Sequence, residues 1–99
     1  METKEFQNKI LEFLAKWDEK RDDIPTKQKT FTHLIEEIGE LAKQYVNQET
    51  RKERYDEKEV ENAIGDIFIQ LTKLAQLHGL DIEETVLKII EEEKEIFKK

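Results

Sequence analysis

The stretch His33-Leu-Ile-Glu-Glu-Ile-Gly-Glu-Leu-Ala-Lys43 decides how the chain is interpreted, because it places carboxylates inside an apolar helical pattern. At about 100° per residue, the apolar side chains around it form one stripe on a helix. The members of this stripe are Phe31, Leu34, Ile35, Ile38, Leu41, Ala42, Tyr45 and Val46. Glu37 and Glu40 lie beside this stripe rather than opposite it. Carboxylates at such a border face the groove between packed helices, where they are costly unless a cation compensates them.

The same acidic pattern occurs a second time near the C-terminus. Glu91, Glu92 and Glu95 repeat the spacing of Glu36, Glu37 and Glu40, but they lie in a run of charge, which is typical of a solvated face. The first match is therefore functional only if the chain supplies a partner elsewhere.

Length and composition indicate one small helical domain. Ninety-nine residues suit a single domain, residues 1–99, with a modest core. With 41% charged residues, 36% apolar residues, one Pro and three Gly, the chain favours long amphipathic helices over a sheet. We therefore expect an all-α, four-helix bundle whose apolar stripes are completed by oligomerisation. The absence of Cys excludes disulfides, thiol nucleophiles and zinc–thiolate sites.

Charge and hydropathy narrow the possible partners. No apolar run approaches membrane-spanning length, and the polar start Met1-Glu-Thr-Lys-Glu shows no signal peptide, so we expect a cytoplasmic protein without a membrane partner. A net charge of −7 argues against binding a nucleic acid polymer. It does not argue against a nucleotide bound through a divalent metal, because the metal reverses the local charge balance.

Helical periodicity predicts four helices and no strand, near residues 3–20, 26–47, 57–78 and 82–97. The segment that ends at Pro25 separates the first two helices, because the residue before a proline is pushed out of helical conformation. Thr26 is expected to cap the second helix. Residues 48–56 have no apolar stripe and are interpreted as a frayed helix end or a loop. Gly79 ends the third helix, and Asp81 caps the fourth with a Glu three residues later.

Asp66 is the acidic residue within the apolar part of the third helix. If the second and third helices pack antiparallel, Glu37 and Glu40 can face Asp66 across one groove. Converging carboxylates repel one another unless a cation lies between them, and oxygen-only ligands suit Mg²⁺ or Mn²⁺. Geometry alone leaves the alternative open that Asp66 caps a helix or bonds locally to Lys73 or Gln70.

A longer pattern surrounds these acidic residues: Glu36-Glu37-x-x-Glu40, then Gly65-Asp66-Ile67-Phe68-Ile69-Gln70-Leu71, Leu74-Ala75 and Gly79-Leu80-Asp81. This pattern, over about residues 30–90, resembles the MazG-like all-α nucleoside triphosphate pyrophosphohydrolases. The resemblance implies a helical bundle that forms a homodimer or a homotetramer. It also implies Mg²⁺-dependent hydrolysis of a nucleoside triphosphate to the monophosphate and pyrophosphate, with nucleotide-pool house-cleaning as the role.

The resemblance also implies roles for the acidic residues. Glu37 and Glu40 would be metal ligands, with Glu36 assisting, and Asp66 would be a further ligand. Water would attack the α-phosphorus, with Glu36 or Glu37 orienting or deprotonating it. We expect Lys73 to neutralise the polyphosphate, although a plain exposed lysine is the alternative.

The chain departs from the family pattern at one position. The Glu-x-x-Asp motif should place a Glu at position 63, where this sequence has Ala63, and alanine cannot bind a metal. Asn62, one turn before Asp66, or Glu59, two turns before it, could supply the missing oxygen on the same face.

Other side chains have two interpretations each. His33 could contact the substrate or a metal ligand, or be a structural histidine. Trp17 and Phe13 could stack a base, or belong to the core. Two other functions stay open: a non-catalytic nucleotide-binding or regulatory member of the same fold, which Ala63 motivates, and a structural helical bundle without a ligand. A di-iron site is disfavoured because no Glu precedes His33 or His78 by three residues.

Overall fold

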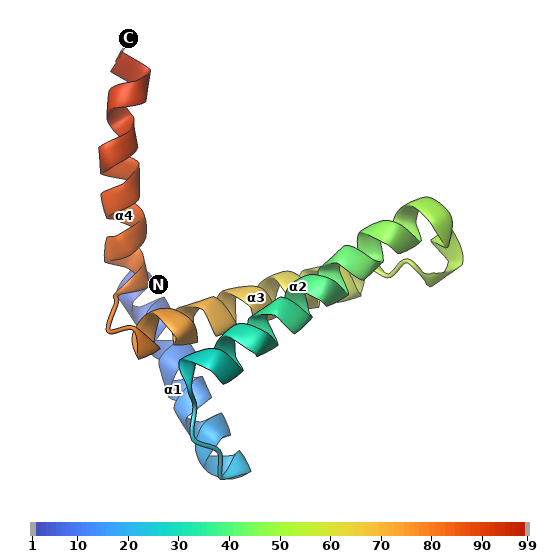
Figure 1. Cartoon of the computed structure of the whole chain (residues 1–99), viewed down its shortest axis with the longest axis horizontal. Helices are drawn as coiled ribbons and strands as arrows, with labels where there is room; N and C mark the ends of the chain where they lie inside the picture. The colour runs from blue at the N-terminus through green and yellow to red at the C-terminus, as the bar shows by residue number, and fades with distance from the viewer. Residues whose placement is uncertain (1, 99) are drawn as a thin grey trace.

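The computed structural model describes residues 2–98 and, within that range, contains helices and no strand. The elements are α1 (Thr3–Arg21), α2 (Lys27–Thr50), the 3₁₀-helix η1 (Lys52–Arg54), α3 (Glu57–Leu77), α4 (Ile82–Glu93) and the 3₁₀-helix η2 (Lys94–Lys98). In Figure 1, α2 and α3 run alongside each other, α1 crosses near one end of this pair, and α4 projects away from it. The predicted all-α fold with four helices is confirmed.

The helix ends form where local sequence signals predict them. The Lys29 N–H donates to the Thr26 hydroxyl at 3.1 Å, and the Glu84 N–H donates to the Asp81 carboxylate at 2.9 Å. Gly79 has φ = 72°, a left-handed conformation that glycine adopts without strain when it ends a helix. These contacts confirm the predicted caps of α2 and α4 and the stop of α3.

Two boundaries differ from the prediction by more than one residue. α2 continues to Thr50, beyond the predicted end at residue 47. Asn47 is buried, at 2% exposure, and its amide donates to the Arg54 carbonyl oxygen at 3.4 Å. Residue 47 is therefore held inside the helix, and the chain reverses direction between it and Arg54. At the other end of the chain, residues 94–98 form a 3₁₀-helix instead of continuing α4.

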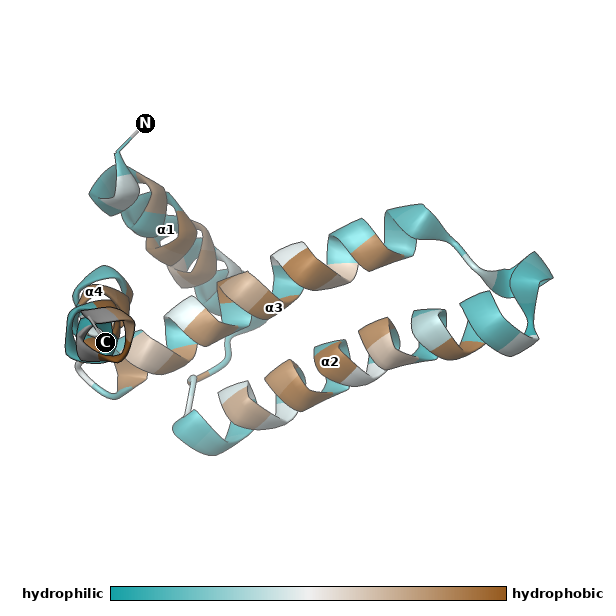
Figure 2. Ribbon diagram, turned by 90° about the horizontal axis from the view of Figure 1, so that it is seen from above, coloured by the Kyte–Doolittle hydropathy of each residue, from teal (hydrophilic) through white to brown (hydrophobic). Residues whose placement is uncertain are grey.

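α2 and α3 form an antiparallel pair, which Figure 2 shows from above. Near the connecting segment, the Asp56 N–H donates to the Gln44 side-chain oxygen at 2.9 Å. Ala63, at 4% exposure, lies in the buried core, where its small side chain lets the helices approach. The other buried apolar residues of the described chain are Ile10, Leu14 and Leu34.

Much of the apolar surface of the chain remains exposed. On α2 and α4 the exposed side chains include Phe31, Ile35, Ile38, Tyr45, Val46, Val86, Leu87, Ile89 and Ile90. Contiguous apolar surface of this kind on a small domain typically marks a site of association. None of the described helices combines the length and the apolar run that crossing a membrane requires.

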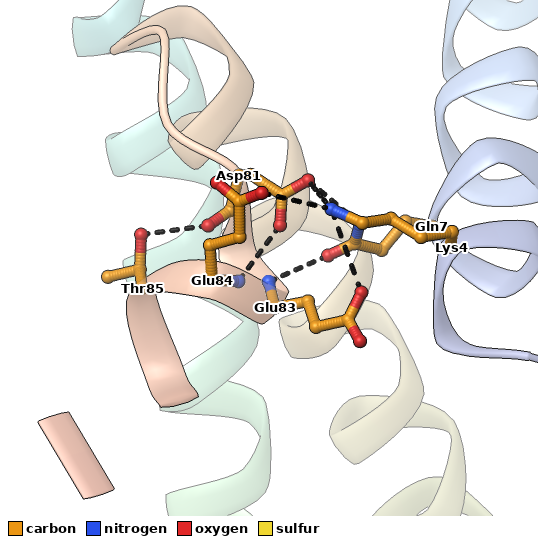
Figure 3. A network of polar contacts seen from close by, with 6 residues as sticks. All are labelled: Lys4, Gln7, Asp81, Glu83, Glu84 and Thr85. Carbon is orange, nitrogen blue, oxygen red and sulfur yellow. Dashed lines mark hydrogen bonds and ion pairs between the residues drawn. The ribbon is translucent and has the colours of Figure 1, made fainter. Parts of the chain in front are cut away.

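A polar network ties the start of α4 to the start of α1 (Figure 3). The Asp81 carboxylate accepts hydrogen bonds from Lys4 and, at 3.5 Å, from the Gln7 amide. The Glu83 N–H donates to the Gln7 side-chain oxygen at 2.8 Å. The hydrogen bond from Lys4, assisted by the N–H of Glu84, lowers the pKa of Asp81. The cap of α4 is therefore also its anchor on α1.

Candidate functional site

A hollow of about 240 Å³ lies where α1, α2 and α3 meet. We call it the acidic groove, and its polar lining comprises Arg21, His33, Glu37, Asp66 and Gln70, beside Trp17. Glu37 comes from α2 and Asp66 from α3. The structure thus brings these two carboxylates to one groove, as antiparallel packing of the helices predicts.

Glu37 is held beside a histidine. His33 lies one turn before it on α2, and its Nε2 is 3.2 Å from the Glu37 carboxylate. The Glu37 side chain is 20% exposed, whereas that of His33 is 39% exposed. Glu37 is therefore oriented by a neighbour on its own helix, within a groove that still admits solvent.

The other predicted catalytic and metal-binding residues lie outside the lining of this groove. Glu36 and Glu40 are exposed on α2, and Glu59 and Asn62 are exposed on α3. By the antiparallel register of the two helices, Glu40 is level with the α3 turn that carries Glu59 and Asn62. The candidate oxygen donors thus form two groups at successive turns of the helix pair. Glu37 and Asp66 form one group, and Glu40 lies with Glu59 and Asn62 in the other.

The donor chemistry of the groove fits a hard divalent cation, because carboxylate oxygens are the ligands that Mg²⁺ prefers. Glu37 and Asp66 offer two such groups. Within residues 2–98, however, no group of three or more His, Asp or Glu side chains lies close enough together to hold a metal ion. The three-carboxylate site that adds Glu40 stays a prediction.

A second hollow of about 120 Å³ adjoins the acidic groove and shares Trp17, Arg21, His33 and Gln70 with it. We call it the polar hollow. Lys29 also lines it and donates to the Asp23 carboxylate at 3.1 Å, which lowers the pKa of Asp23. Two further residues of the hollow, Lys73 and Asp18, are also paired with each other. Both lysines of this hollow are therefore paired with a carboxylate.

Lys73 is paired with a residue of α1, which neither the exposed-lysine alternative nor a local bond to Asp66 predicted. Its ammonium donates to Asp18 on α1 at 2.9 Å, and the two side chains are 12% and 15% exposed. It is thus neither a plain exposed lysine nor the local partner of Asp66. Its predicted contact with polyphosphate remains a prediction, and it would compete with Asp18.

The last turns of α1 contribute Arg21, which the sequence did not single out, next to Trp17 and Phe13. Arg21 lines both hollows, and its guanidinium lies 4.6 Å from the centre of the Trp17 ring. Trp17 and Phe13 are 41% and 52% exposed, so their interpretation as core residues is wrong. Arg21 follows Trp17 by one helical turn, and this spacing is the sequence signal that could have predicted their contact.

A model of the MazG nucleotide pyrophosphohydrolase domain matches residues 25–97. The matched range contains α2, α3 and α4, including Glu37 and Asp66, and leaves out α1. No curated protein and no solved structure was found to match the chain. Since the match covers well over half of the sequence, the chain belongs to the MazG nucleotide pyrophosphohydrolase domain family.

Proposed function

We propose that this protein hydrolyses a nucleoside triphosphate to the nucleoside monophosphate and pyrophosphate, with Mg²⁺ or Mn²⁺ as cofactor. The observation that carries the proposal is the placement of Glu37 and Asp66, from facing helices, in one groove of a MazG-family domain. House-cleaning of the nucleotide pool would follow from this activity.

The proposed metal ligands are Glu37 and Asp66, with Glu40 as the third carboxylate. Asn62 or Glu59 would replace the glutamate that is missing at position 63. When bound, the ion would polarise phosphoryl oxygens and make a coordinated water more acidic.

In the proposed reaction, the oxygen of a water molecule forms a bond to the α-phosphorus while the bond from this phosphorus to the bridging oxygen breaks. Pyrophosphate leaves with that oxygen, and Glu36 or Glu37 takes the proton of the water. His33, beside Glu37, would hold this carboxylate in the groove and contact the substrate. Lys73 would approach the polyphosphate from the polar hollow.

The proposal is tested by incubating the full chain with each common ribo- and deoxynucleoside triphosphate and Mg²⁺. We expect equal amounts of monophosphate and pyrophosphate from at least one substrate, and loss of this activity in Glu37→Gln. Glu92→Gln, in the second acidic pattern outside the groove, is the matched control and should remain active. Release of orthophosphate, or activity in Glu37→Gln equal to that of the parent, would refute the proposal.

A non-catalytic nucleotide-binding function is the second candidate. It is favoured by Ala63, which is buried at 4% exposure and offers no oxygen where the family pattern has a carboxylate. A protein that binds nucleotide with Mg²⁺ but does not turn it over would support this candidate. A structural bundle without a ligand is the third candidate, and it requires that Mg²⁺ and nucleotides leave the melting temperature unchanged.

We also propose that the chain assembles as a homodimer or a homotetramer. The support is the exposed apolar surface, which on α4 includes Val86, Leu87, Ile89 and Ile90. A hollow of about 360 Å³ between α1, α3 and α4 has an almost wholly apolar lining that includes Phe6, Phe68, Leu71, Val86 and Leu87. A second copy that packs against this surface would remove it from water.

A further inference from the structure

α1 precedes the residues that the family model matches, yet it forms one wall of the acidic groove and of the polar hollow. Its position there is fixed by a specific contact, the ion pair between Asp18 and Lys73 of α3. Asp18 directly follows Trp17, so this contact also fixes the helical turn that presents the indole to the groove. The placement of α1 is thus suited to binding whatever occupies the groove.

Phe13, Trp17 and Arg21 follow one another at intervals of one helical turn, and we call them the α1 platform. The rings of Phe13 and Trp17 are stacked, with centroids 6.1 Å apart and 18° between their planes. The Arg21 guanidinium covers the Trp17 ring at 4.6 Å. Both aromatic side chains remain more than two-fifths exposed. Planar groups in this arrangement offer the surface on which proteins stack bases.

The acidic groove has two chemically different sides. Glu37 and Asp66 provide negative charge, which suits metal-bound phosphates, whereas the α1 platform provides planar and apolar surface. A nucleotide has two matching ends, since its phosphates are charged and its base is flat. Gln70 lines both hollows, and its amide can both donate to and accept from the edge of a base.

We infer that the α1 platform binds the base of the nucleotide, which takes the place of the Arg21 guanidinium over the Trp17 ring, with Gln70 at the edge of the base. This inference rests on the proposed function, because it requires a nucleotide in the groove. It assigns base recognition to a helix outside the matched domain, and it separates base binding from the binding of the phosphates by the acidic residues. Loss of one stacked base typically lowers affinity about 5- to 150-fold.

The test compares a nucleotide with the same phosphate chain lacking a base. Binding of an α,β-methylene nucleoside triphosphate and of inorganic tripolyphosphate, each with Mg²⁺, is measured by calorimetry for the full chain. We expect Trp17→Ala to weaken the nucleotide about 5- to 150-fold and to leave tripolyphosphate unchanged. Trp17→Phe should keep most of the nucleotide affinity, because it retains an aromatic ring. If the alanine variant does not fold, Trp17→Phe replaces it in this comparison. Phe31→Ala, an exposed aromatic of α2 outside the groove, is the matched control.

Trp17 is the single tryptophan of the chain, so its fluorescence reports directly on the platform. We expect the nucleotide analogue to quench it and tripolyphosphate to leave it nearly unchanged. Equal affinity losses for both ligands in Trp17→Ala, or no loss for either, would overturn the inference. A parent protein that shows nucleotide-specific quenching without releasing pyrophosphate would refute hydrolysis and leave base binding by α1 standing.

Discussion

The Lys73 ammonium on α3 donates to the Asp18 carboxylate on α1 at 2.9 Å, and both side chains are largely buried. This contact joins residues far apart in the sequence and lies in the lining of the polar hollow, on the side that α1 forms. A buried charge that loses its partner is strongly destabilising, because it has been removed from water without compensation. The pair therefore couples the stability of the fold to the shape of the candidate site.

Asp18→Asn should lower the free energy of unfolding by about 1.5–3 kcal/mol, because Lys73 keeps its charge without a carboxylate partner. Urea denaturation followed by circular dichroism measures this loss. Asp23→Asn is the matched control, since it removes the ion pair with Lys29, whose side chains are 40% and 60% exposed. It should cost much less than Asp18→Asn. Equal losses in the two variants would contradict a special role for the Asp18–Lys73 pair.

The anchor of α4 should make stability depend on acid pH. Asp81 has a lowered pKa in the folded chain, mainly through the hydrogen bond from Lys4. Its contribution is therefore complete above the ordinary carboxyl pKa of about 3.9 and is lost as the pH falls through the folded value. Asp81→Asn keeps a capping side chain but removes the charge, so its melting temperature should differ less from the parent at pH 3 than at pH 7. A difference that is independent of pH would contradict this account.

Metal binding should stabilise the chain through Asp66. If Glu37, Glu40 and Asp66 hold Mg²⁺ or Mn²⁺, the ion at about 100 times its dissociation constant adds about 2.7 kcal/mol to the free energy of unfolding. Asp66→Asn should lose the metal-dependent rise in melting temperature while circular dichroism shows unchanged helix content. Glu92→Gln should keep it. The site is rejected if the Asp66 variant shows the same shift as the parent.

The replacement for the missing glutamate can be identified by two substitutions. Asn62→Ala and Glu59→Ala each remove one candidate oxygen on the α3 turns before Asp66. We expect one of them to reduce pyrophosphate release by at least about 10-fold in excess Mg²⁺, because metal ligation at that position would be lost. Full activity in both variants would show that neither residue replaces the glutamate.

Self-association should bury the exposed surface of α4. We expect light scattering at micromolar concentration to give at least twice the chain mass of 11.9 kDa. Ile89→Glu should weaken association, since Ile89 is 52% exposed on the apolar side of α4. Lys88→Glu also adds negative charge to this helix, but at a position where the lysine side chain is 77% exposed, and should have little effect. A monomeric parent protein would contradict the proposal.

The fold was predictable where the signals are local. Helical periodicity located all four helices, and Thr26, Gly79 and Asp81 marked their ends because caps depend on residues one turn away. The placement of Glu37 and Asp66 in one groove also followed from periodicity, since antiparallel packing of two stripes aligns their flanks. These predictions needed no knowledge of distant contacts.

The orientation of α1 was not predictable in this way. It depends on Asp18 meeting Lys73, two charged residues that resemble any others on a helical surface until the helices are packed. For the same reason the exposure of Trp17 was missed, because aromatic residues at helical spacing usually indicate a core. Periodicity places residues on a face of a helix but does not identify what that face meets.

The central claim, that water attacks the α-phosphorus, is tested most directly by hydrolysis in ¹⁸O-labelled water. The products of the preferred nucleoside triphosphate are separated and weighed by mass spectrometry, with Mg²⁺ present. We predict that one ¹⁸O atom enters the nucleoside monophosphate and that the pyrophosphate carries none. Label in the pyrophosphate would show attack at the β-phosphorus and contradict the account, as would the absence of pyrophosphate among the products.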